Sequence, residues 1–576
     1  MLNEQAAYIV QQRKITGGGY MDKTLDKGVT KGGRQYIRPG LVTVAMATLL
    51  GMYGGADALE IQTGNEDVKV NWDNSIRYNL GYRVGKADPA VLASPDLNDG
   101  DSNFRSGIVT SRLDLLSEFD LSYKKAYGFR LSGAGWYDPV YSKGNLNKDL
   151  ATSNAFDSNG NQIAINSYTK RYYLGPSGEL LDAFVFGKFD IAEIPFQVKV
   201  GRNTQFWGEG LGFNAALNGI SYAQMPIDVA KAYAVPNTGA KELFRPLNNI
   251  SVTAQPTSTL TVMGQYFLEW EPNRYPEAGS YMAPYDYLFN GGIGSQQAFG
   301  GLVRGNDIKP KNVGDWGVGA RWSPEELNGT TFGLYYRNFS DKMPQAHIDT
   351  DNSLLRFAYA DNIHLYGLSY SQQILGVSVG AELSYRQNMP LLNTGAAVAA
   401  VDLPSRGNVS TARGDTMHAV LNFLGLINRT PVFDAASYTV EFNWGNYLKV
   451  TDDPNRTFMG YDSYPYLNRA TKDFVSIDLN FAPTWFQIFP GADLTVPLYY
   501  GRGLRGNSPT NIIQKDAGSY SVGLSIDYLA RHKFDLLYVD YFGKYTIDPL
   551  LGLINNGDPA LLKDRGTVSL TYRYTF

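Results

Sequence analysis

The sequence contains no cysteine, and this absence excludes several kinds of site. A chain of 576 residues without cysteine has no disulfide, no thiolate metal ligand and no cysteine nucleophile. Long apolar runs are missing too, since no stretch reaches the roughly 18 residues that a membrane-spanning helix needs. A helical membrane protein is therefore excluded. A membrane barrel is not, because only every second residue of its strands must be apolar.

The first 58 residues are typical of a secretion signal. A short apolar core at 41–53 follows several basic residues, and Ala-Asp-Ala at 56–58 is a small-x-small cleavage site. We therefore predict a signal peptide over 1–58, with Leu59 as the first mature residue; Met21 is the candidate start, because it gives a signal of ordinary length. An anchor helix is the weaker interpretation, because the core is too short to span a bilayer.

Charge is scarce and aromatic residues are abundant. Charged residues make up 18% of the chain and aromatic residues 13%, with 40 tyrosines. Tyrosine enrichment is typical of the aromatic girdles of membrane barrels, although carbohydrate-binding sandwiches share it. Residues 1–58 hold seven of the 51 Lys/Arg and four of the 55 Asp/Glu, so the mature net charge is −7. We expect no nucleic-acid partner, since that needs a basic face.

The last eleven residues, 566–576, alternate between an apolar and a polar face. Side chains alternate across a strand, so lipid could cover one face and water the other. The segment ends on a phenylalanine, as the closing strand of an outer-membrane barrel does. Three of its aromatic residues also resemble the signal that the outer-membrane assembly machinery recognises: Tyr572, Tyr574 and Phe576.

The same alternation recurs along the mature chain and predicts an all-β fold. We expect a transmembrane antiparallel β-barrel over 59–576 with about 18 strands, in the range 16–18. The candidate strands lie at about 68–84, 108–123, 128–138, 180–190, 195–207, 248–255, 259–271, 314–323, 330–340, 355–370, 375–388, 414–425, 434–448, 472–486, 492–502, 518–529, 532–542 and 565–576.

Long and short connections alternate between these strands. Bacterial outer-membrane barrels have an even strand count, short periplasmic turns and long external loops. A soluble sandwich gives no reason for such an alternation. Two of the long connections, 208–247 and 272–313, are candidates to enter the lumen and narrow it.

The polar strand faces should line the interior, because Arg or Lys facing lipid costs about 2–4 kcal/mol at the midplane. Their charges are nearly balanced. A strongly selective pore would show rings of one sign, whereas balance favours charge pairing between the walls and an inserted plug. The residues concerned are Lys69, Arg77, Arg83, Arg112, Arg130, Arg321, Arg337, Arg386, Arg573, Asp73, Asp114, Glu118, Asp120, Asp182, Glu269, Glu382, Glu441 and Asp478.

Several motifs occur in a family order. They are V-G-R-N-T-Q-F-W-G-E at 200–209, M-P-I-D-V at 225–229, Y-F-L-E-W-E-P at 266–272, G-L-Y-Y-R-N at 333–338 and E-L-S-Y-R at 382–386. Together they resemble the Gram-negative exported family catalogued as domain of unknown function 1302. The resemblance implies an outer-membrane barrel in bacteria that degrade apolar compounds. Its relatives often occur near inner-membrane transporters, which implies envelope transport; it implies no catalytic residues.

Seven residues are candidates for lumen contacts or a constriction. They lie where strands end and the chain turns: Arg202, Trp207, Glu209, Tyr222, Asp228, Glu269 and Trp270. The structural alternative is that Arg202 and Glu209 pair to fix the loop, because charges away from water need partners. For Trp270, the alternative is an interfacial tryptophan at a strand end.

Enzymatic and metal sites receive little support. The four histidines, His347, His364, His418 and His532, show no zinc-ligand spacing, and no nucleophile with a base is indicated. An Asp-rich stretch at 96–103 is similar to a calcium loop but lacks the closing glutamate, so a solvated external loop is expected. We therefore expect that the protein binds no cofactor and is not an enzyme.

The sequence therefore predicts an outer-membrane channel for uptake of small, largely apolar compounds in a Gram-negative cell. Steroid-, terpenoid-, aromatic- or alkyl-like solutes would fit an apolar patch in a narrowed lumen. The alternative is a barrel that works with periplasmic and inner-membrane partners in lipid or hydrophobe transport. An outer-membrane enzyme is a third, weaker hypothesis.

Overall fold

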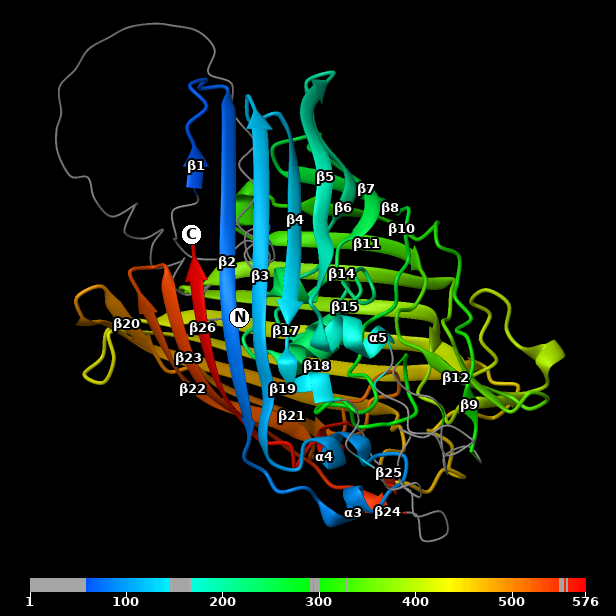
Figure 1. Cartoon of the computed structure of the whole chain (residues 1–576). Helices are drawn as coiled ribbons and strands as arrows, with labels where there is room; N and C mark the ends of the chain where they lie inside the picture. Colours follow the sequence, from blue (N-terminus) through cyan, green and yellow to red (C-terminus); the bar gives the residue numbers. More distant parts are fainter. Residues whose placement is uncertain are drawn as a thin grey trace, which may run out of the picture.

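Eighteen strands close into an antiparallel barrel (Figure 1). The computed structural model describes residues 59–576 apart from 144–146, 148–164, 166, 291–293, 295–300, 328, 548–553 and 556–557. The predicted signal peptide, 1–58, lies outside the described residues. The first barrel strand, β2 (Val68–Arg83), pairs with β3 on one side and with the last strand, β26, on the other, which closes the ring.

The other barrel strands follow in chain order around the ring. Each is paired with its neighbours: β3 (Gly107–Tyr123), β4 (Tyr127–Tyr137), β5 (Ser177–Ile191), β6 (Ile194–Asn203), β7 (Leu247–Ala254), β8 (Leu260–Phe267), β10 (Trp316–Trp322), β11 (Thr331–Phe339), β14 (Ile363–Ile374), β15 (Val377–Pro390), β17 (Arg413–Ile427), β18 (Ala435–Asp452), β19 (Asp473–Phe489), β20 (Ala492–Thr495), β21 (Leu498–Arg505), β22 (Gly518–Tyr528), β23 (His532–Phe542) and β26 (Thr567–Thr575). The segments β20 and β21 are one interrupted strand, because both pair with β19 and β22.

The two faces of each strand meet different surroundings, as β26 illustrates. Ser569, Thr571 and Arg573 are buried on the inward face, whereas Leu570 is 51% exposed on the outward face. Side-chain alternation thus puts apolar residues around the outside and polar residues in the lumen. This architecture is that of an outer-membrane protein.

Short turns gather at one end of the barrel and long connections at the other. One two-residue turn, Ala192 and Glu193, has φ of 49° and 67°, as a hairpin turn that matches strand twist requires. The long connections carry a second sheet and short helices: β9 (Val303–Arg304), β12 (Gln345–Asp349), β13 (Leu354–Ala358) and β16 (Ala396–Val398) in the sheet, β24 (Thr546–Ile547) paired with β25 (Ile554–Asn555), and α3 (Pro89–Leu92), α4 (Asp99–Asn103), α5 (Ser167–Thr169), α9 (Asp558–Leu561), η1 (Pro139–Lys143), η2 (Lys170–Leu174) and η5 (Ala400–Asp402). At the turn end lie β1 (Leu59–Ile61) and η4 (Glu325–Leu327).

The strand prediction is confirmed in number and is wrong in one place. The stretch 355–370 is not one strand, because β13 belongs to the second sheet and β14 begins only at Ile363. The turn predicted at 371–374 is the end of β14, and the chain reverses at Leu375 and Gly376 instead. Both segments alternate in polarity, so the pattern did not show that the chain leaves the barrel between them.

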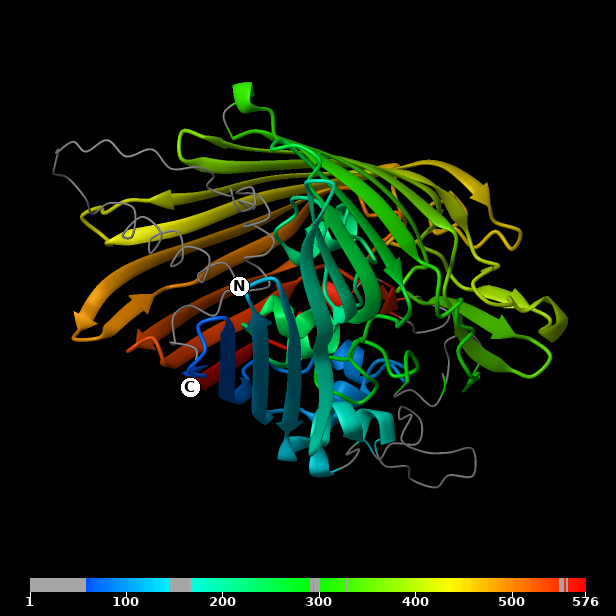
Figure 2. The ribbon, with the colours of Figure 1, turned by 90° about the horizontal axis from the view of Figure 1, so that it is seen from above.

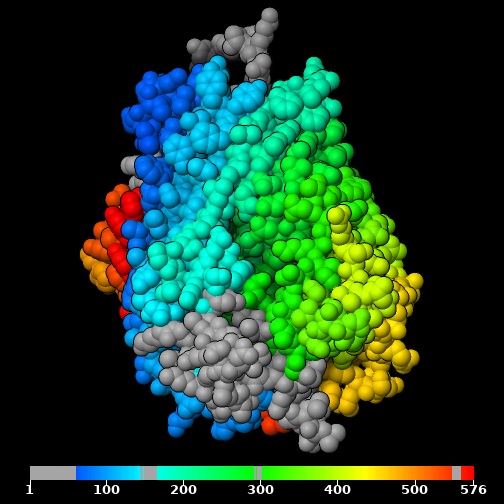
Figure 3. All heavy atoms as spheres, turned by 45° about the vertical axis from the view of Figure 1, so that its right-hand side comes forward, coloured from blue at the N-terminus to red at the C-terminus, as the bar shows by residue number. Residues whose placement is uncertain are grey.

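The wall is not equally tall around the ring. On β5, pairing with β6 begins only at Ala183, so the first residues of β5 pair with β4 alone. The surface is hollowed beside this end of β5 (Figure 3). No helix in the described part of the chain is long and apolar enough to cross a membrane.

The seam between β2 and β26 gives a prediction about assembly. Replacing Tyr574 and Phe576 by Ser should remove most of the assembled barrel, because the two rings stack at 5.3 Å on the outward face of the closing strand and serine supplies no such apolar surface. The heat-modifiable band on a denaturing gel measures the folded barrel. Thr575→Ser on the same strand is the control, and wild-type amounts of the double variant would contradict the prediction.

Candidate functional site

The connection between β6 and β7, residues 204–246, lies inside the barrel, and we call it the plug. It carries three short helices, α6 (Phe213–Asn218), α7 (Val229–Ala234) and α8 (Ala240–Leu243). Figure 2 shows this green segment within the ring of strands. Its side chains and backbone contact inward-facing residues on both sides of the lumen, from β3 to β19.

Two wall carboxylates hold the plug by its backbone. Glu382 on β15 accepts hydrogen bonds from the N–H groups of Glu209, Gly210 and Ile220, the last two at 2.6 Å. Glu441 on β18 accepts from Leu211 at 2.7 Å and Gly212 at 3.1 Å. Buried carboxylates need such donors, and charged acceptors make the stronger hydrogen bonds.

The glycines of the plug make this close approach possible. A Cβ at Gly208 would lie 2.4 Å from the Glu382 carboxylate, and its φ of +100° also disfavours other residues. At Gly219 a Cβ would lie 2.8 Å from the same carboxylate. The run W-G-E-G-L-G at 207–212 is thus a carboxylate-binding backbone loop, and its glycine spacing is the signal that the sequence interpretation did not use.

Wall arginines hold the backbone oxygens of the same loop. Arg337 on β11 donates to the carbonyl groups of Ile220 at 2.8 Å and Tyr222 at 2.7 Å. Arg386 on β15 donates to Leu217 at 3.2 Å and to the carbonyl of Gly219 at 3.0 Å. The loop is therefore tied through both kinds of backbone group, which leaves few buried polar groups without partners.

Ion pairs tie the charged side chains of the plug to other walls. Glu242 pairs with Arg77 on β2 at 3.1 Å and with Lys231 at 2.7 Å, and Lys241 pairs with Glu118 on β3. Although burial opposes ionisation, the two cations hold the pKa of Glu242 well below its usual range. Balanced charge in the lumen thus reflects pairing between wall and plug.

The predicted pair of Arg202 and Glu209 is not formed. Arg202 bonds to Glu269 at 2.7 Å, at the ends of β6 and β8, whereas Glu209 bonds to Arg321 on β10 at 2.5 Å. The reason is that β6 ends at Asn203, so the chain turns inward and carries Glu209 across the lumen. Of the seven candidate residues, two lie at the wall, four in the plug and one, Trp270, in the connection after β8.

The remaining candidates are buried anchors. Trp207 stacks on Tyr335 at 5.9 Å, and the Tyr222 hydroxyl donates to Asp341 at 2.7 Å. The interfacial interpretation of Trp270 is wrong, because its indole N–H donates to the buried Asp341 carbonyl at 3.2 Å. Asp228 caps α7 and pairs with Arg274, which joins the plug to the long connection after β8.

The Asp-rich stretch at 96–103 is buried rather than solvated. It forms α4, where Asp101 pairs with Arg83 at 2.7 Å and Arg565 at 3.1 Å. Asp286, from the connection after β8, accepts the backbone N–H of Asp99 at 2.9 Å. In the described ranges, no group of three or more His, Cys, Asp or Glu residues is placed to hold a metal ion.

The histidines have structural partners. His418 contacts Asn218 of the plug at 3.2 Å and Thr416 at 3.0 Å, and His347 accepts the backbone N–H of Ser410. The other two contact tyrosine hydroxyls, His364 that of Tyr336 and His532 that of Tyr572. These contacts provide no carboxylate that would orient a catalytic imidazole.

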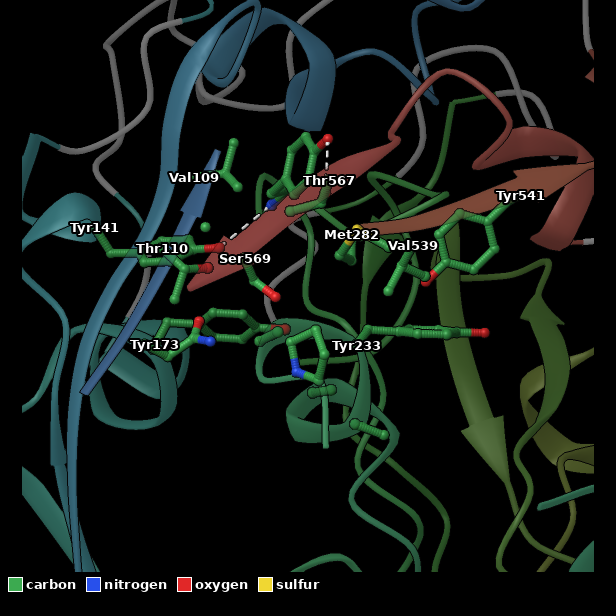
Figure 4. Close-up of a pocket in the computed structure, with 17 residues that line it drawn as sticks. Val109, Thr110, Tyr141, Tyr173, Tyr233, Met282, Val539, Tyr541, Thr567 and Ser569 are labelled. Atoms are coloured by element: carbon green, nitrogen blue, oxygen red, sulfur yellow. Dashed lines mark hydrogen bonds between the residues drawn. The ribbon is translucent and has the colours of Figure 1, made fainter. Parts of the chain in front are cut away.

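Two cavities of similar size lie between the plug and the wall in the described part of the chain. The outer cavity, of about 80 Å³, is on the side of the long connections, with the rings of Tyr141 and Tyr173 on one side and Tyr233 and Tyr541 on the other (Figure 4). The inner cavity, also about 80 Å³, is on the side of the short turns, lined by β18, β19, β21, β22 and β23 and by Asn237 of the plug. A smaller cavity, of about 20 Å³, lies between the plug and β3, β4 and β5 and is lined by charged residues, and one of about 50 Å³ lies within the plug.

The model of a family described as a protein of unknown function, DUF1302, matches residues 40–576. The chain belongs to this family.

Among solved structures, this DUF1302 member is similar to proteins of two bacteria. Acinetobacter baumannii OccAB4 shares 10% identity over 88% of this chain and 98% of its own, with a TM-score of 0.39. Acinetobacter baumannii OccAB3 shares 9% over 88% and 99%, with 0.42, and Pseudomonas aeruginosa OccK9 (OpdG) shares 10% over 88% and 98%, with 0.38. These values describe a loose likeness of shape. No curated protein matches the sequence.

The carboxylate of Glu382 should keep the plug of this DUF1302 member in place. Glu382→Gln replaces one acceptor oxygen by an amide that faces backbone N–H donors, so each unpaired donor costs about 1–3 kcal/mol. We expect faster proteolysis within 204–246 and a lower unfolding midpoint in urea. Glu326→Gln, at an exposed position in η4, is the control. Equal proteolysis of both variants would contradict this role.

Glu209 should make plug seating depend on pH. Burial raises its pKa from 4.5 to about 7, although Arg321 opposes the shift. Because the folded pKa is the higher one, this stabilising contribution is fully present below about 4.5 and is lost as the pH rises through about 7. Thermal unfolding across this range should show a shallower pH dependence for Glu209→Gln than for the wild type. The exposed Glu325→Gln should keep the wild-type slope, and a Glu209→Gln slope that matches it would disprove the assignment.

Proposed function

We propose that this protein is an outer-membrane channel for uptake of small, largely apolar compounds, with the plug as its constriction. The observation that carries the proposal is the pair of cavities between plug and wall inside a closed barrel. None of the 17 residues that line the outer cavity is charged, and five are tyrosines. A mostly apolar lining with a few polar groups is what a small-molecule site requires.

The barrel itself supports the proposed place in the cell. Its apolar outer face meets lipid, and the seam strand ends on the aromatic residues that we expect the assembly machinery to recognise. We further propose that residues 1–58 are the export signal, and that 208–247 and 272–313 narrow the lumen. The second segment supports the first, because Arg274 pairs with Asp228 of the plug.

Ion current through the purified full chain in planar bilayers tests the channel. We expect discrete current steps that an aromatic alcohol interrupts and that glucose, which is polar and of similar size, does not. The reason is that tyrosine rings line the outer cavity and bind apolar faces. Absence of steps, or equal interruption by both solutes, would contradict the proposal. The accessory transport function would be favoured by two results together: a barrel that carries no current, and recovery of a periplasmic or inner-membrane partner at fixed stoichiometry.

A further inference from the structure

We propose that solutes pass the plug along the wall of β22, β23 and β26, where the two larger cavities lie, and that they are uncharged ring compounds with hydroxyl groups. The narrowest part of this route is the plug segment 233–237. The inference rests on the proposed channel function and assigns a route and a solute class to it.

The two cavities follow one another along a single strand face. On β23, Val539 and Tyr541 line the outer cavity, and Lys533, Asp535 and Leu537 line the inner one. These five residues alternate, so they share the lumen-facing side of the strand. Leu537 and Val539 are two residues apart, which spans roughly 7 Å. The cavities are therefore neighbours along one wall.

The plug also passes from one cavity to the other, at the level of Leu537 and Val539 on β23. Pro236 lines the outer cavity and the next residue, Asn237, lines the inner cavity. Asn237 has a φ of 60°, so the backbone bends here. Tyr233 stands edge-on to Tyr541 with 6.0 Å between ring centroids, and the two rings mark the narrow point between plug and wall (Figure 4).

The opposite side of the plug is fixed. Its backbone is held by Glu382, Glu441 and Arg386 through hydrogen bonds of 2.6–3.0 Å. On the β23 and β26 side, the contacts include the Tyr233–Tyr541 ring contact and a 3.4 Å hydrogen bond from Arg573 to the Asn237 carbonyl. Opening on this side keeps the hydrogen bonds to Glu382 and Glu441, whereas opening on the other side breaks these buried charged hydrogen bonds.

The chemistry of the lining selects the solute. The outer cavity offers tyrosine rings and the hydroxyls of Thr110 and Ser569, without a charged residue. The inner cavity offers the inward-facing Tyr499 with serine, threonine and asparagine groups, and one residue of each sign. Aromatic faces bind flat rings, and hydroxyl groups bind polar substituents, so a neutral ring with hydroxyls fits both.

One acceptor in the inner cavity is available to such a solute. The Asp535 side chain is 4% exposed, and its Oδ1 accepts no hydrogen bond from the described residues. A buried carboxylate oxygen without a donor is costly, and a solute hydroxyl would supply the donor. Asp535 is thus the residue that recognises the hydroxyl group along the route.

Single cysteines test the route, because the chain has none of its own. Ala232→Cys lies in the outer cavity, Ser525→Cys in the inner cavity and Ala216→Cys, the matched control on α6, in the cavity within the plug. Each full-length variant is checked for the heat-modifiable folded band, placed in a planar bilayer and treated with a bulky uncharged methanethiosulfonate. We expect the current to fall at least threefold at positions 232 and 525 and to remain unchanged at 216.

The outcomes separate the route from the function. The route is overturned, and the channel function kept, if the wild type carries current and the reagent lowers the current of the variant at 216 but not of those at 232 and 525. A wild-type barrel without current overturns both. For the solute class, 4-hydroxybenzyl alcohol should interrupt the current of the wild type with dwell times at least threefold longer than for Asp535→Asn. Equal dwell times overturn the assignment of Asp535.

Discussion

The hydrogen bonds from the plug backbone to Glu382 and Glu441 are the constraint on which the rest of the structure depends. The plug shuts two carboxylates off from bulk water, which would be very costly without donors, and its backbone supplies the N–H groups that offset this cost. In return, the carboxylates fix the loop 207–212 against β15 and β18. The position of this loop decides where space remains between plug and wall, and therefore where a solute can pass.

Most of the fold could be predicted from the sequence, because the period-2 pattern of a lipid-facing strand is imposed by physics at every strand. The seam shows this: Leu570 faces out and Thr571 faces in, as the alternation of 566–576 requires. The one misassigned stretch, 355–370, alternates as well, since β13 is also a half-buried strand. Periodicity reports that a strand has two environments; it does not report which sheet the strand joins.

The site was predicted less well, for a different reason. Arg202 and Glu209 are seven residues apart, and proximity in sequence suggested a pair, but the chain turns inward after Asn203 and gives each a partner from a distant strand. The Asp-rich stretch at 96–103 similarly meets Arg565, which lies at the other end of the chain. Partners separated by 67 to 464 residues leave no local pattern. Glycine spacing is the exception, because Gly208 must be small for a local, geometric reason.

The closed ring has a consequence for how the molecule can form. The plug leaves the wall after β6 and returns to it at β7, yet it is bonded to β15, β18 and β19, which are made later. A bonded segment with both ends in the wall cannot cross a completed ring of hydrogen-bonded strands. The plug must therefore be in the interior before β26 meets β2, or enter through an open mouth. The last step of biogenesis, joining the two ends of the barrel, encloses a lumen whose contents are already in place.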